Sequence, residues 1–425
     1  MSKDWKIIKL SDIVNHKKGF AFKSKWYRKE GRRIIKVSDF TDRGIDITKS
    51  VFIDSNLGDK FNNVTLESGA IIIATVGSWP NNPASIVGKV IKVPKDANNS
   101  LLNQNAVKIY PKDEKELNNE FLFHRLKNND FSQHLIGGAQ GSANQASITL
   151  IDIYSFELEL PPYLEQSSIA KILSDLDTKI ELLQNQNNTL EKIGKTIFKQ
   201  WFVDFEFPNE EGKIYKSSGG DMTESKLGKI PTGWNVNNYG DLLEFERGIE
   251  PGSRNYLDKP GEDTVLFYRV GDLLSGESRV YVKKDIIKNK FSKSQNVLVS
   301  FDGTVGRVKI GIEGSYSTGI RKVHSKDGSF SNGYIFFLMN SKFIQDKIVE
   351  FAKGTTIPHA GEAVKNFLTA IPNEQTRSKF NVLSDKIYLK LLSNLNAIKS
   401  LQKTRDLLLP KLMSGQIRVP LDGSK

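Results

Sequence analysis

The sequence carries one pattern twice, in the same order, and this duplication limits the possible folds more than any other feature. The segment 4–20, DWKIIKLSDIVNHKKGF, is matched at constant offset by 233–249, GWNVNNYGDLLEFERGI. The matched positions are Trp5 with Trp234, Asp12 with Asp241, Lys18 with Arg247, and Gly19 with Gly248. The later matches are 34–40 with 267–273, 66–78 with 292–304, 106–113 with 320–327, and 160–166 with 371–375. A tandem duplication of one structural unit is therefore predicted.

Each copy is expected to hold a mixed globular part followed by a long helix. Short apolar runs such as AIIIATV and NVLVSF lie between Gly, Asn and Asp turns, which indicates strands. The segments 116–136 and 331–352 carry the apolar spacing of helices. The predicted fold class is α+β: two tandem α/β domains, related as a pseudo-twofold internal repeat and accompanied by two long helices.

The two long helices show the spacing of a coiled coil. Apolar residues alternate at steps of three and four, which is the seam by which helices pack on one another. In the first copy the seam is Ile169, Leu173, Leu176, Ile180, Leu183, Asn187, Leu190, Gly194, Ile197 and Trp201. In the second it is Phe380, Leu383, Ile387, Leu391, Asn394, Ile398, Leu401, Arg405, Leu408 and Leu412, with a one-residue slip near Ile387. The alternative is two core helices in separate domains.

The two helices can pair with each other within one chain. We expect an antiparallel coiled coil, with a globular domain at either end and a pseudo-twofold centre near residues 184–186. That arrangement brings Asn187 opposite Asn394, and such a polar pair fixes the register of a coiled coil at some loss of stability.

Composition narrows the functional classes. The chain has 425 residues, and its 61 Lys and Arg against 49 Asp and Glu give a formal charge of +12. Such an excess favours a polyanionic partner such as nucleic acid. The alternative is a Lys-rich surface that binds no polyanion. With no cysteine there is no thiolate chemistry. The five histidines lack metal-ligand spacing. No targeting or membrane segment is evident, so a cytoplasmic protein is expected.

The ordered duplicate pattern resembles the specificity (S) subunit of type I restriction-modification systems. The elements that carry the resemblance are the W-x4-L-x-D opening, the PPYLEQ and IPNEQ closings, the helix after each closing, and the segments FKQWFVDFEFPN and PKLMSGQIRV. On this resemblance the expected boundaries are a target recognition domain at 1–160, a helix at 161–205, a linker at 206–228, a second recognition domain at 229–372, a second helix at 373–418, and a tail at 419–425.

The resemblance implies a DNA-specificity subunit without a catalytic centre. Each recognition domain would read half of a bipartite, asymmetric site in double-stranded DNA. The coiled coil would act as spacer and would dock two methyltransferase (M) subunits, through which restriction (R) subunits join. S-adenosylmethionine, ATP and Mg²⁺ would be held by those partners and none by this chain. Deleting one heptad from each helix should then change the preferred DNA spacer.

The residues themselves offer little catalytic chemistry. The sequence LPPY at 160–163 is similar to the amine-binding motif of amino-methyltransferases, but its leading Leu cannot accept the required hydrogen bond. A proline break between a strand and a helix is the simpler interpretation. The turns ATVGS and GTVG match no nucleotide-binding pattern.

Candidate DNA contacts lie in polar, Gly-rich loops that differ between the two copies. Phosphates are bound by Lys, Arg or backbone amides, and base edges are read by Arg, Lys, Asn or Gln. In the first domain the candidates are Lys17, Lys18, Lys23, Lys36, Trp79, Asn81, Asn82, Gln104, Asn105 and Gln140. In the second they are Arg247, Arg254, Tyr256, Arg269, Thr304, Arg307, Arg321, Lys353, Thr355 and His359. For each loop, an ordinary surface turn is the alternative.

Two other functions remain open from the sequence. One is a restriction or methylation enzyme that acts alone, for which a cofactor-binding assay is the test. The other is a coiled-coil scaffold that binds only protein, which salt-dependent retention on duplex DNA would distinguish.

Overall fold

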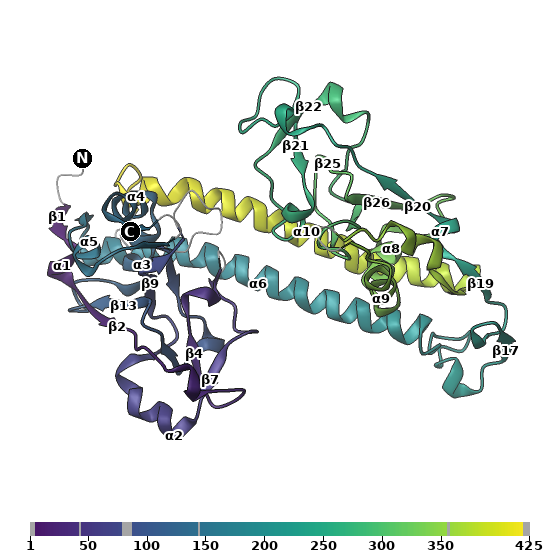
Figure 1. Cartoon of the computed structure of the whole chain (residues 1–425), viewed down its shortest axis with the longest axis horizontal. Helices are drawn as coiled ribbons and strands as arrows, with labels where there is room; N and C mark the ends of the chain where they lie inside the picture. Colours follow the sequence, from purple (N-terminus) through teal and green to yellow (C-terminus); the bar gives the residue numbers. More distant parts are fainter. Residues whose placement is uncertain (1–4, 42–43, 79–86, 143–144, 355–357, 420–425) are drawn as a thin grey trace, which may run out of the picture. The chain divides into compact units, whose positions relative to one another are not determined.

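The protein is described from a computed structural model of the whole chain, and the described residues are 5–41, 44–78, 87–142, 145–354 and 358–419. The chain forms two compact units. Unit 1 comprises residues 1–179 and 401–425, and unit 2 comprises residues 180–400. Each unit therefore takes part of both long helices, α6 (Tyr163–Phe202) and α10 (Glu374–Met413), which are coloured teal and yellow in Figure 1.

Unit 1 is built on a four-stranded antiparallel sheet in the order β11-β9-β13-β2. Its central strand β9 (Ile71–Ala74) is buried at every residue, as expected for a β-branched run covered on both faces. The other strands are β11 (Val90–Lys92), β13 (Ala106–Pro111) and β2 (Val14–Lys18).

A second sheet of unit 1 has the order β3-β7-β4-β12-β8, in which β12 runs parallel to β4. Its strands are β3 (Tyr27–Arg28), β7 (Val51–Ile53), β4 (Arg32–Ile35), β12 (Ser100–Leu102) and β8 (Thr65–Leu66). The smaller pairings involve β1 (Lys6–Lys9) with β16 (Glu157–Leu160), β5 (Phe40–Thr41) with β6 (Gly44–Ile45), and β15 (Gln145–Ser147) with both β10 (Val76–Gly77) and β14 (Gln140–Ser142).

The helices of unit 1 are α1 (Leu10–Ile13), α2 (Ser55–Gly58), α3 (Asn119–Lys127), α4 (Asn129–Gly138) and α5 (Leu150–Tyr154). The helical segment expected at 116–136 is thus divided, and Asn118 caps its first part by accepting a hydrogen bond from the Phe121 amide at 3.0 Å. The core of this unit joins α3, the sheet and Ile169 and Leu173 of α6 to Leu412 and Met413 of α10.

Unit 2 repeats this topology. Its four-stranded sheet has the order β24-β23-β26-β20, and β25 runs parallel to β21 as β12 does to β4. The strands are β24 (Val308–Lys309), β23 (Val297–Ser300), β26 (Ile320–Ser325), β20 (Leu243–Arg247), β21 (Thr264–Tyr268), β22 (Tyr281–Lys283), β25 (Ser315–Tyr316), and β19 (Asn235–Asn238) paired with β27 (Leu368–Ile371). The helices are α7 (Tyr239–Leu242), α8 (Asn332–Met339) and α9 (Lys342–Glu350).

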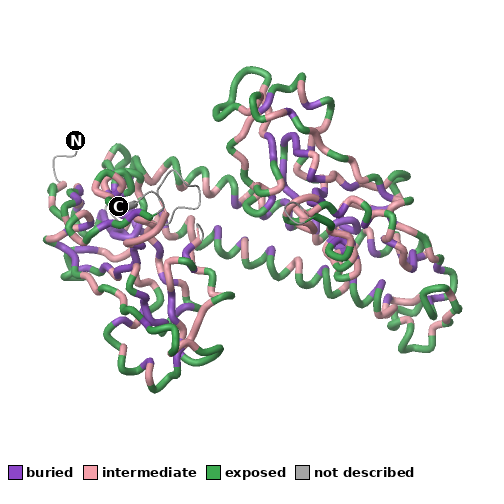
Figure 2. The backbone as a smooth tube through the Cα atoms, viewed as in Figure 1, coloured by how far each residue is buried: buried purple, intermediate pink, exposed green. Residues whose placement is uncertain are grey.

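The predicted internal repeat is confirmed by this equivalence. The aligned segments 66–78 and 292–304 contain β9 and β23, and the segments 106–113 and 320–327 contain β13 and β26. Figure 2 shows buried residues gathered in the interior of each unit, where these strands lie.

The segment expected as a linker, 206–228, contains local structure in unit 2. The Phe207 ring stacks on Tyr215 at 4.5 Å and on Trp234 at 5.2 Å between ring centroids. Beyond it, β17 (Met222–Ser225) pairs with β18 (Gly228–Pro231). None of the helices in the described ranges is both long and apolar enough to cross a membrane.

Candidate nucleic-acid interface

The long helices run antiparallel within each unit. In unit 2, Asn394 Nδ2 donates to Asn187 Oδ1 at 2.8 Å and to Gln186 Oε1 at 2.8 Å, so the amide pair expected from the sequence is present. In unit 1, Arg405 Nη1 lies 2.7 Å from Asp177 Oδ1. Arg405, the charged position of the second seam, is thus paired with an acidic residue of α6. Residue numbers fall along one helix as they rise along the other, which is the antiparallel arrangement.

None of the predicted coiled-coil residues is exposed. Fully buried are Leu173, Ile180, Leu183, Asn187, Leu391, Asn394 and Ile398, and partly buried are Leu176, Leu190, Ile197, Ile387, Leu401 and Leu408. Gly194 in the same seam allows close packing of α6 on α8, because a Cβ there would lie 2.1 Å from the Phe337 ring.

The loops predicted to contact DNA in unit 2 meet at one end of the four-stranded sheet. The Gly248 amide donates to Ile320 O at 3.2 Å, and the Phe301 amide donates to Gly319 O at 2.8 Å. The Ala360 amide in turn donates to Phe301 O at 2.7 Å. Four segments distant in the sequence therefore form one cluster, which we call the unit 2 loop cluster. Its described residues are 246–256, 301–307, 316–322, 353–354 and 358–360.

Two arginines lie side by side in this cluster. Arg247 and Arg321 are direct partners on the antiparallel strands β20 and β26. Arg247 Nε donates to Thr318 O at 3.2 Å, and the Arg321 guanidinium lies over the Phe301 ring at 5.4 Å. Burial lowers the pKa of Arg321, and the charge of Arg247 lowers it further, while Asp302 opposes both effects.

An acidic group and a histidine complete the unit 2 loop cluster. His359 Nδ1 lies 2.8 Å from Asp302 Oδ1, and the His359 side chain is largely exposed. Lys353 and His359 are held opposite each other, because each backbone amide donates to the other residue's carbonyl oxygen. The exposed groups of the cluster are thus predominantly hydrogen-bond donors, which suits an acceptor-rich ligand.

The predicted loops of unit 1 meet in the equivalent place. The Gly19 amide donates to Ala106 O at 3.1 Å, and the Thr75 amide donates to Asn105 O at 2.8 Å. The Ile148 amide donates to Thr75 O at 2.9 Å, which joins the segment after β15 to the others. We call the residues around these contacts, 18–19, 75, 103–106 and 148, the unit 1 loop cluster; it includes the predicted residues Lys18, Gln104 and Asn105. Lys36 lies next to it, because the carbonyl of the preceding residue, Ile35, accepts a hydrogen bond from the Asn103 amide at 3.0 Å.

A repeated glycine makes both loop clusters possible. A Cβ on Gly19 would lie 2.0 Å from Asn103 O, and a Cβ on Gly248 would lie 2.1 Å from Tyr316 O. Only a residue without a side chain allows the two backbones to cross so closely. The matched pair Gly19 and Gly248 is therefore explained by the scaffold rather than by DNA contact.

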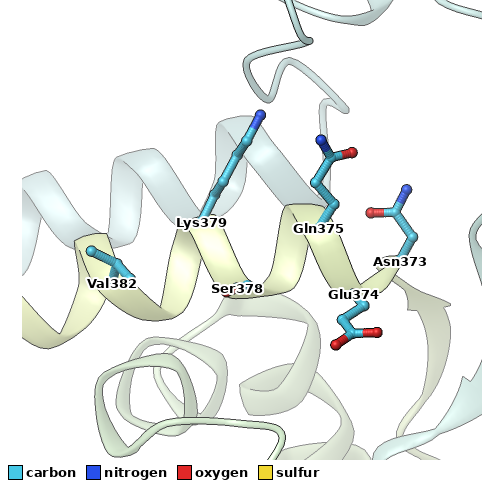
Figure 3. A pocket seen from close by; sticks show the side chains of 6 residues that line it. All are labelled: Asn373, Glu374, Gln375, Ser378, Lys379 and Val382. Atoms are coloured by element: carbon cyan, nitrogen blue, oxygen red, sulfur yellow. The ribbon is translucent and has the colours of Figure 1, made fainter.

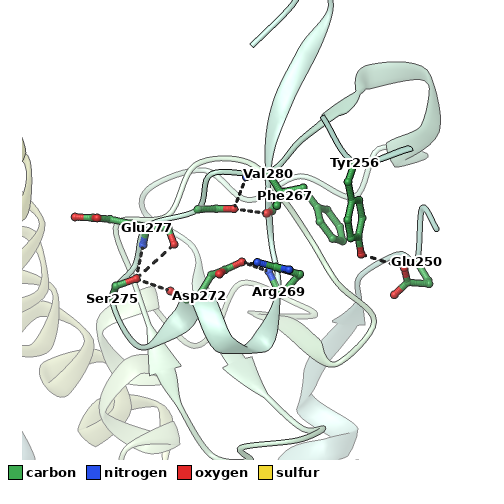
Figure 4. A network of polar contacts seen from close by, with 9 residues as sticks. Glu250, Tyr256, Phe267, Arg269, Asp272, Ser275, Glu277 and Val280 are labelled. Atoms are coloured by element: carbon green, nitrogen blue, oxygen red, sulfur yellow. Dashed lines mark hydrogen bonds and ion pairs between the residues drawn. The ribbon is translucent and has the colours of Figure 1, made fainter. Parts of the chain in front are cut away.

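Three of the predicted residues already have partners within their own unit. In Figure 4, Arg269 begins a turn in which its backbone amide donates to Asp272 Oδ2 at 2.8 Å, and its Nε lies 3.4 Å from the same oxygen. The Tyr256 hydroxyl donates to Glu250 Oε1 at 3.3 Å, and its ring lies 5.5 Å from Phe267. Lys36 occupies the position of Arg269 in unit 1, where its amide donates to Asp39 Oδ2 at 2.9 Å.

The predicted DNA-binding residues that the structure describes are all accessible. Exposed are Lys18, Lys23, Gln104, Gln140, Arg247, Arg254, Arg269, Thr304, Lys353 and His359, and partly buried are Lys17, Lys36, Asn105, Tyr256, Arg307 and Arg321. Trp79, Asn81, Asn82 and Thr355 lie outside the described residues.

The sequence reasoning missed the groups that hold the unit 2 loop cluster together. Asp302 pairs with His359, and a Cβ on Gly361 would lie 3.1 Å from Arg321 Nη2. Neither contact carries a sequence signal, because each joins segments far apart in the chain. Across the described ranges, no three His, Asp or Glu side chains gather in a way that could hold a metal ion.

The first turns of α10 carry an open hollow. It is lined by Asn373, Glu374, Gln375, Ser378, Lys379 and Val382. Figure 3 shows Gln375 and Lys379 projecting to the same side of the helix. Asn373 Oδ1 caps the helix by accepting from the Thr376 amide at 2.9 Å, so this face is a well-formed helix surface.

Comparison with known proteins agrees with this architecture. The profile of the type I restriction modification DNA specificity domain matches residues 2–192. The type I restriction enzyme MjaIX specificity subunit of Methanocaldococcus jannaschii is 31% identical over 329 residues, which cover 75% of this chain and 73% of that protein. The putative type I restriction enzyme MjaX specificity subunit of the same organism is 24% identical and covers 98% of this chain and 94% of its own length.

A solved structure shares the fold. The crystal structure of the type I restriction-modification system S subunit from M. genitalium has a TM-score of 0.54 at 17% identity, and the match covers 97% of each chain.

Proposed function

This chain belongs to the family of type I restriction enzyme specificity subunits, and on that premise we propose that it directs a methylation and restriction assembly to one bipartite DNA sequence. Each unit reads one half of the site through its loop cluster. One observation carries the proposal: two units of the same topology carry different residues at the same place. An example is Asn105 in unit 1 and Gly319 in unit 2, whose carbonyl oxygens accept equivalent backbone hydrogen bonds. Such an arrangement suits two different half-sites.

The two long helices act in this proposal as spacer and docking surface. We propose that two methyltransferase subunits bind along them and that restriction subunits join through the methyltransferases. The helices carry exposed apolar residues that their own seam does not use, which supports a protein partner. In unit 2 these are Leu182 and Ile193 on α6 and Val382 and Leu389 on α10, each at least 45% exposed. Val382 also lines the hollow at the start of α10.

Chemistry is assigned to the partner subunits. In this proposal S-adenosylmethionine, ATP and Mg²⁺ bind to the methyltransferase and restriction subunits, and this chain provides sequence recognition. The formal charge of +12 supports the affinity for DNA phosphates that recognition requires.

The decisive experiment is DNA binding by the full chain, alone and with its methyltransferase partner, over a range of salt concentration. We expect the logarithm of the association constant to fall linearly with the logarithm of the salt concentration, with a slope of about −0.9 for each phosphate contacted. Selection from a randomised duplex pool should return two conserved half-sites separated by a fixed spacer. Absence of binding at low salt with the partner present would leave a protein-only scaffold. Binding of S-adenosylmethionine by this chain alone would instead favour an independent enzyme.

A further inference from the structure

Because the two units share one topology, each residue of the sheet in unit 2 can be compared with the residue at the same position in unit 1. On β26, Arg321 pairs with Arg247 of β20 and with Val299 of β23. On β13, Val107 pairs with Lys18 of β2 and with Ile73 of β9. Arg321 therefore occupies in unit 2 the position that Val107 occupies in unit 1.

The two residues have opposite chemistry at this shared position. Val107 is fully buried in the apolar core of unit 1, so the scaffold accepts an aliphatic side chain there. Arg321 brings a charge to the same place, where burial and the neighbouring Arg247 lower its pKa. Burying a cation without an ion-pair partner is unfavourable, and the fold does not require it here.

The guanidinium of Arg321 packs against neighbouring residues, but its N–H groups have no hydrogen-bond acceptor among the described residues. Phe301 lies beneath it at 5.4 Å, and Gly361 leaves room for Nη2. Its Nε is buried and has no hydrogen-bond partner among the described residues. Asp302, the acid that acts on its charge, already bonds His359 at 2.8 Å. Neither Nη1 nor Nη2 of Arg321 makes a hydrogen bond or ion pair with a described residue, so these two terminal groups are the donors left for a ligand at the unit 2 loop cluster.

We propose that Arg321 is a sequence-reading residue of unit 2 and that it reads the paired acceptors of a guanine, O6 and N7, in the major groove. This inference rests on the function proposed above. An arginine fork is the usual partner of guanine. A phosphate contact serves both half-sites alike, whereas a charge present in only one copy of a duplicated scaffold points to a base that only one half-site contains.

The test uses the full chain assembled with its methyltransferase partner and a duplex pool randomised in both half-sites. Arg321→Val copies the residue of unit 1, so the scaffold should tolerate it. Arg321→Lys keeps the charge but removes the fork. Lys229→Val, in the exposed β17–β18 hairpin, removes one positive charge away from the loop cluster and serves as the matched control.

We expect the wild type to select a G·C pair in one half-site, and Arg321→Val to lose roughly 10- to 100-fold of the discrimination at that pair. Arg321→Lys should lose most of the same preference. The other half-site should be unchanged in both variants, and Lys229→Val should select the wild-type sequence.

Three results would overturn the inference. An unchanged consensus and affinity in Arg321→Val would make the residue structural. Equal weakening on all sequences, with a salt slope reduced by about one, would make it a phosphate contact. If Arg321→Val fails to fold, full retention of the G·C preference by Arg321→Lys would contradict fork recognition. A wild type without any sequence preference would instead overturn the proposed function itself.

Discussion

The amide pair Asn187–Asn394 places four polar atoms inside an apolar seam, where unpaired donors and acceptors are unfavourable. The pair is satisfied from several sides. Asn187 Nδ2 donates to Leu391 O at 3.4 Å, and Asn394 also bonds Gln186. Its contribution is therefore expected in the choice of register rather than in net stability.

Replacing one or both asparagines by leucine tests this account. Asn187→Leu alone or Asn394→Leu alone should lower the free energy of unfolding by about 1–3 kcal/mol, because each leaves a buried amide with fewer partners. The double variant should be close to the wild type or more stable. Urea denaturation of the four proteins gives the coupling, and strictly additive losses would show that the two amides do not act as a pair.

A buried histidine makes unit 1 sensitive to acid. Burial lowers the pKa of His124 from 6.5 to about 4, against the opposing charge of Asp177. The ring is held neutral, and its Nε2 lies 3.1 Å from Ser174 Oγ. Below pH 6.5 the unfolded chain binds this proton more readily than the folded chain.

The free energy of unfolding should therefore fall as pH drops from about 6.5 to about 4, by ~3 kcal/mol at most from this residue. Above pH 6.5 the residue has no effect. His124→Gln removes the titrating group but retains a side chain able to reach Ser174. Urea denaturation between pH 7 and 5 should show a shallower loss in this variant. If the wild type and His124→Gln lose stability equally as pH falls, His124 is not the cause of the acid sensitivity.

The helices α6 and α10 each cross the boundary between the two units, and this boundary is a suitable place for an insertion. The unit boundary falls between residues 179 and 180 on one helix and between 400 and 401 on the other. Each unit holds a polar pair between the helices, Asn187–Asn394 in unit 2 and Asp177–Arg405 in unit 1. One heptad inserted at both points keeps the seam in phase.

If the helices set the DNA spacer, this double insertion should lengthen the preferred spacer. Seven residues add about 10.5 Å of helix, which corresponds to roughly three base pairs. The distance between the two conserved half-sites in the selected sequences gives the measurement. A seven-residue insertion in one helix alone breaks the pairing and serves as the control. An unchanged spacer in the double insertion would assign the spacer to another part of the assembly.

The sequence predicts what depends on local periodicity. The order of the duplicated segments gives the equivalence of β9 with β23, and the heptad spacing gives the inner faces of both helices and the level of Asn187. The pairing of Asp302 with His359 joins residues 57 apart through loop geometry that no periodic signal encodes. The role of Arg321 is only partly predictable from the sequence. The alignment of 106–113 with 320–327 already shows that Arg321 corresponds to Val107. That its Nε has no hydrogen-bond partner is known only from the structure.

The division of α10 between the two units has a consequence for the order in which the chain can fold. Unit 1 begins at the N-terminal side of the sequence, yet its core includes Leu412 and Met413. During synthesis, Ile169 and Leu173 stay without these partners until almost the whole chain has left the ribosome, whereas residues 180–400 are complete earlier. We expect a released chain that ends at residue 400 to protect unit 2 from protease while unit 1 is cleaved. Equal protection of both would show that unit 1 closes without the last turns of α10.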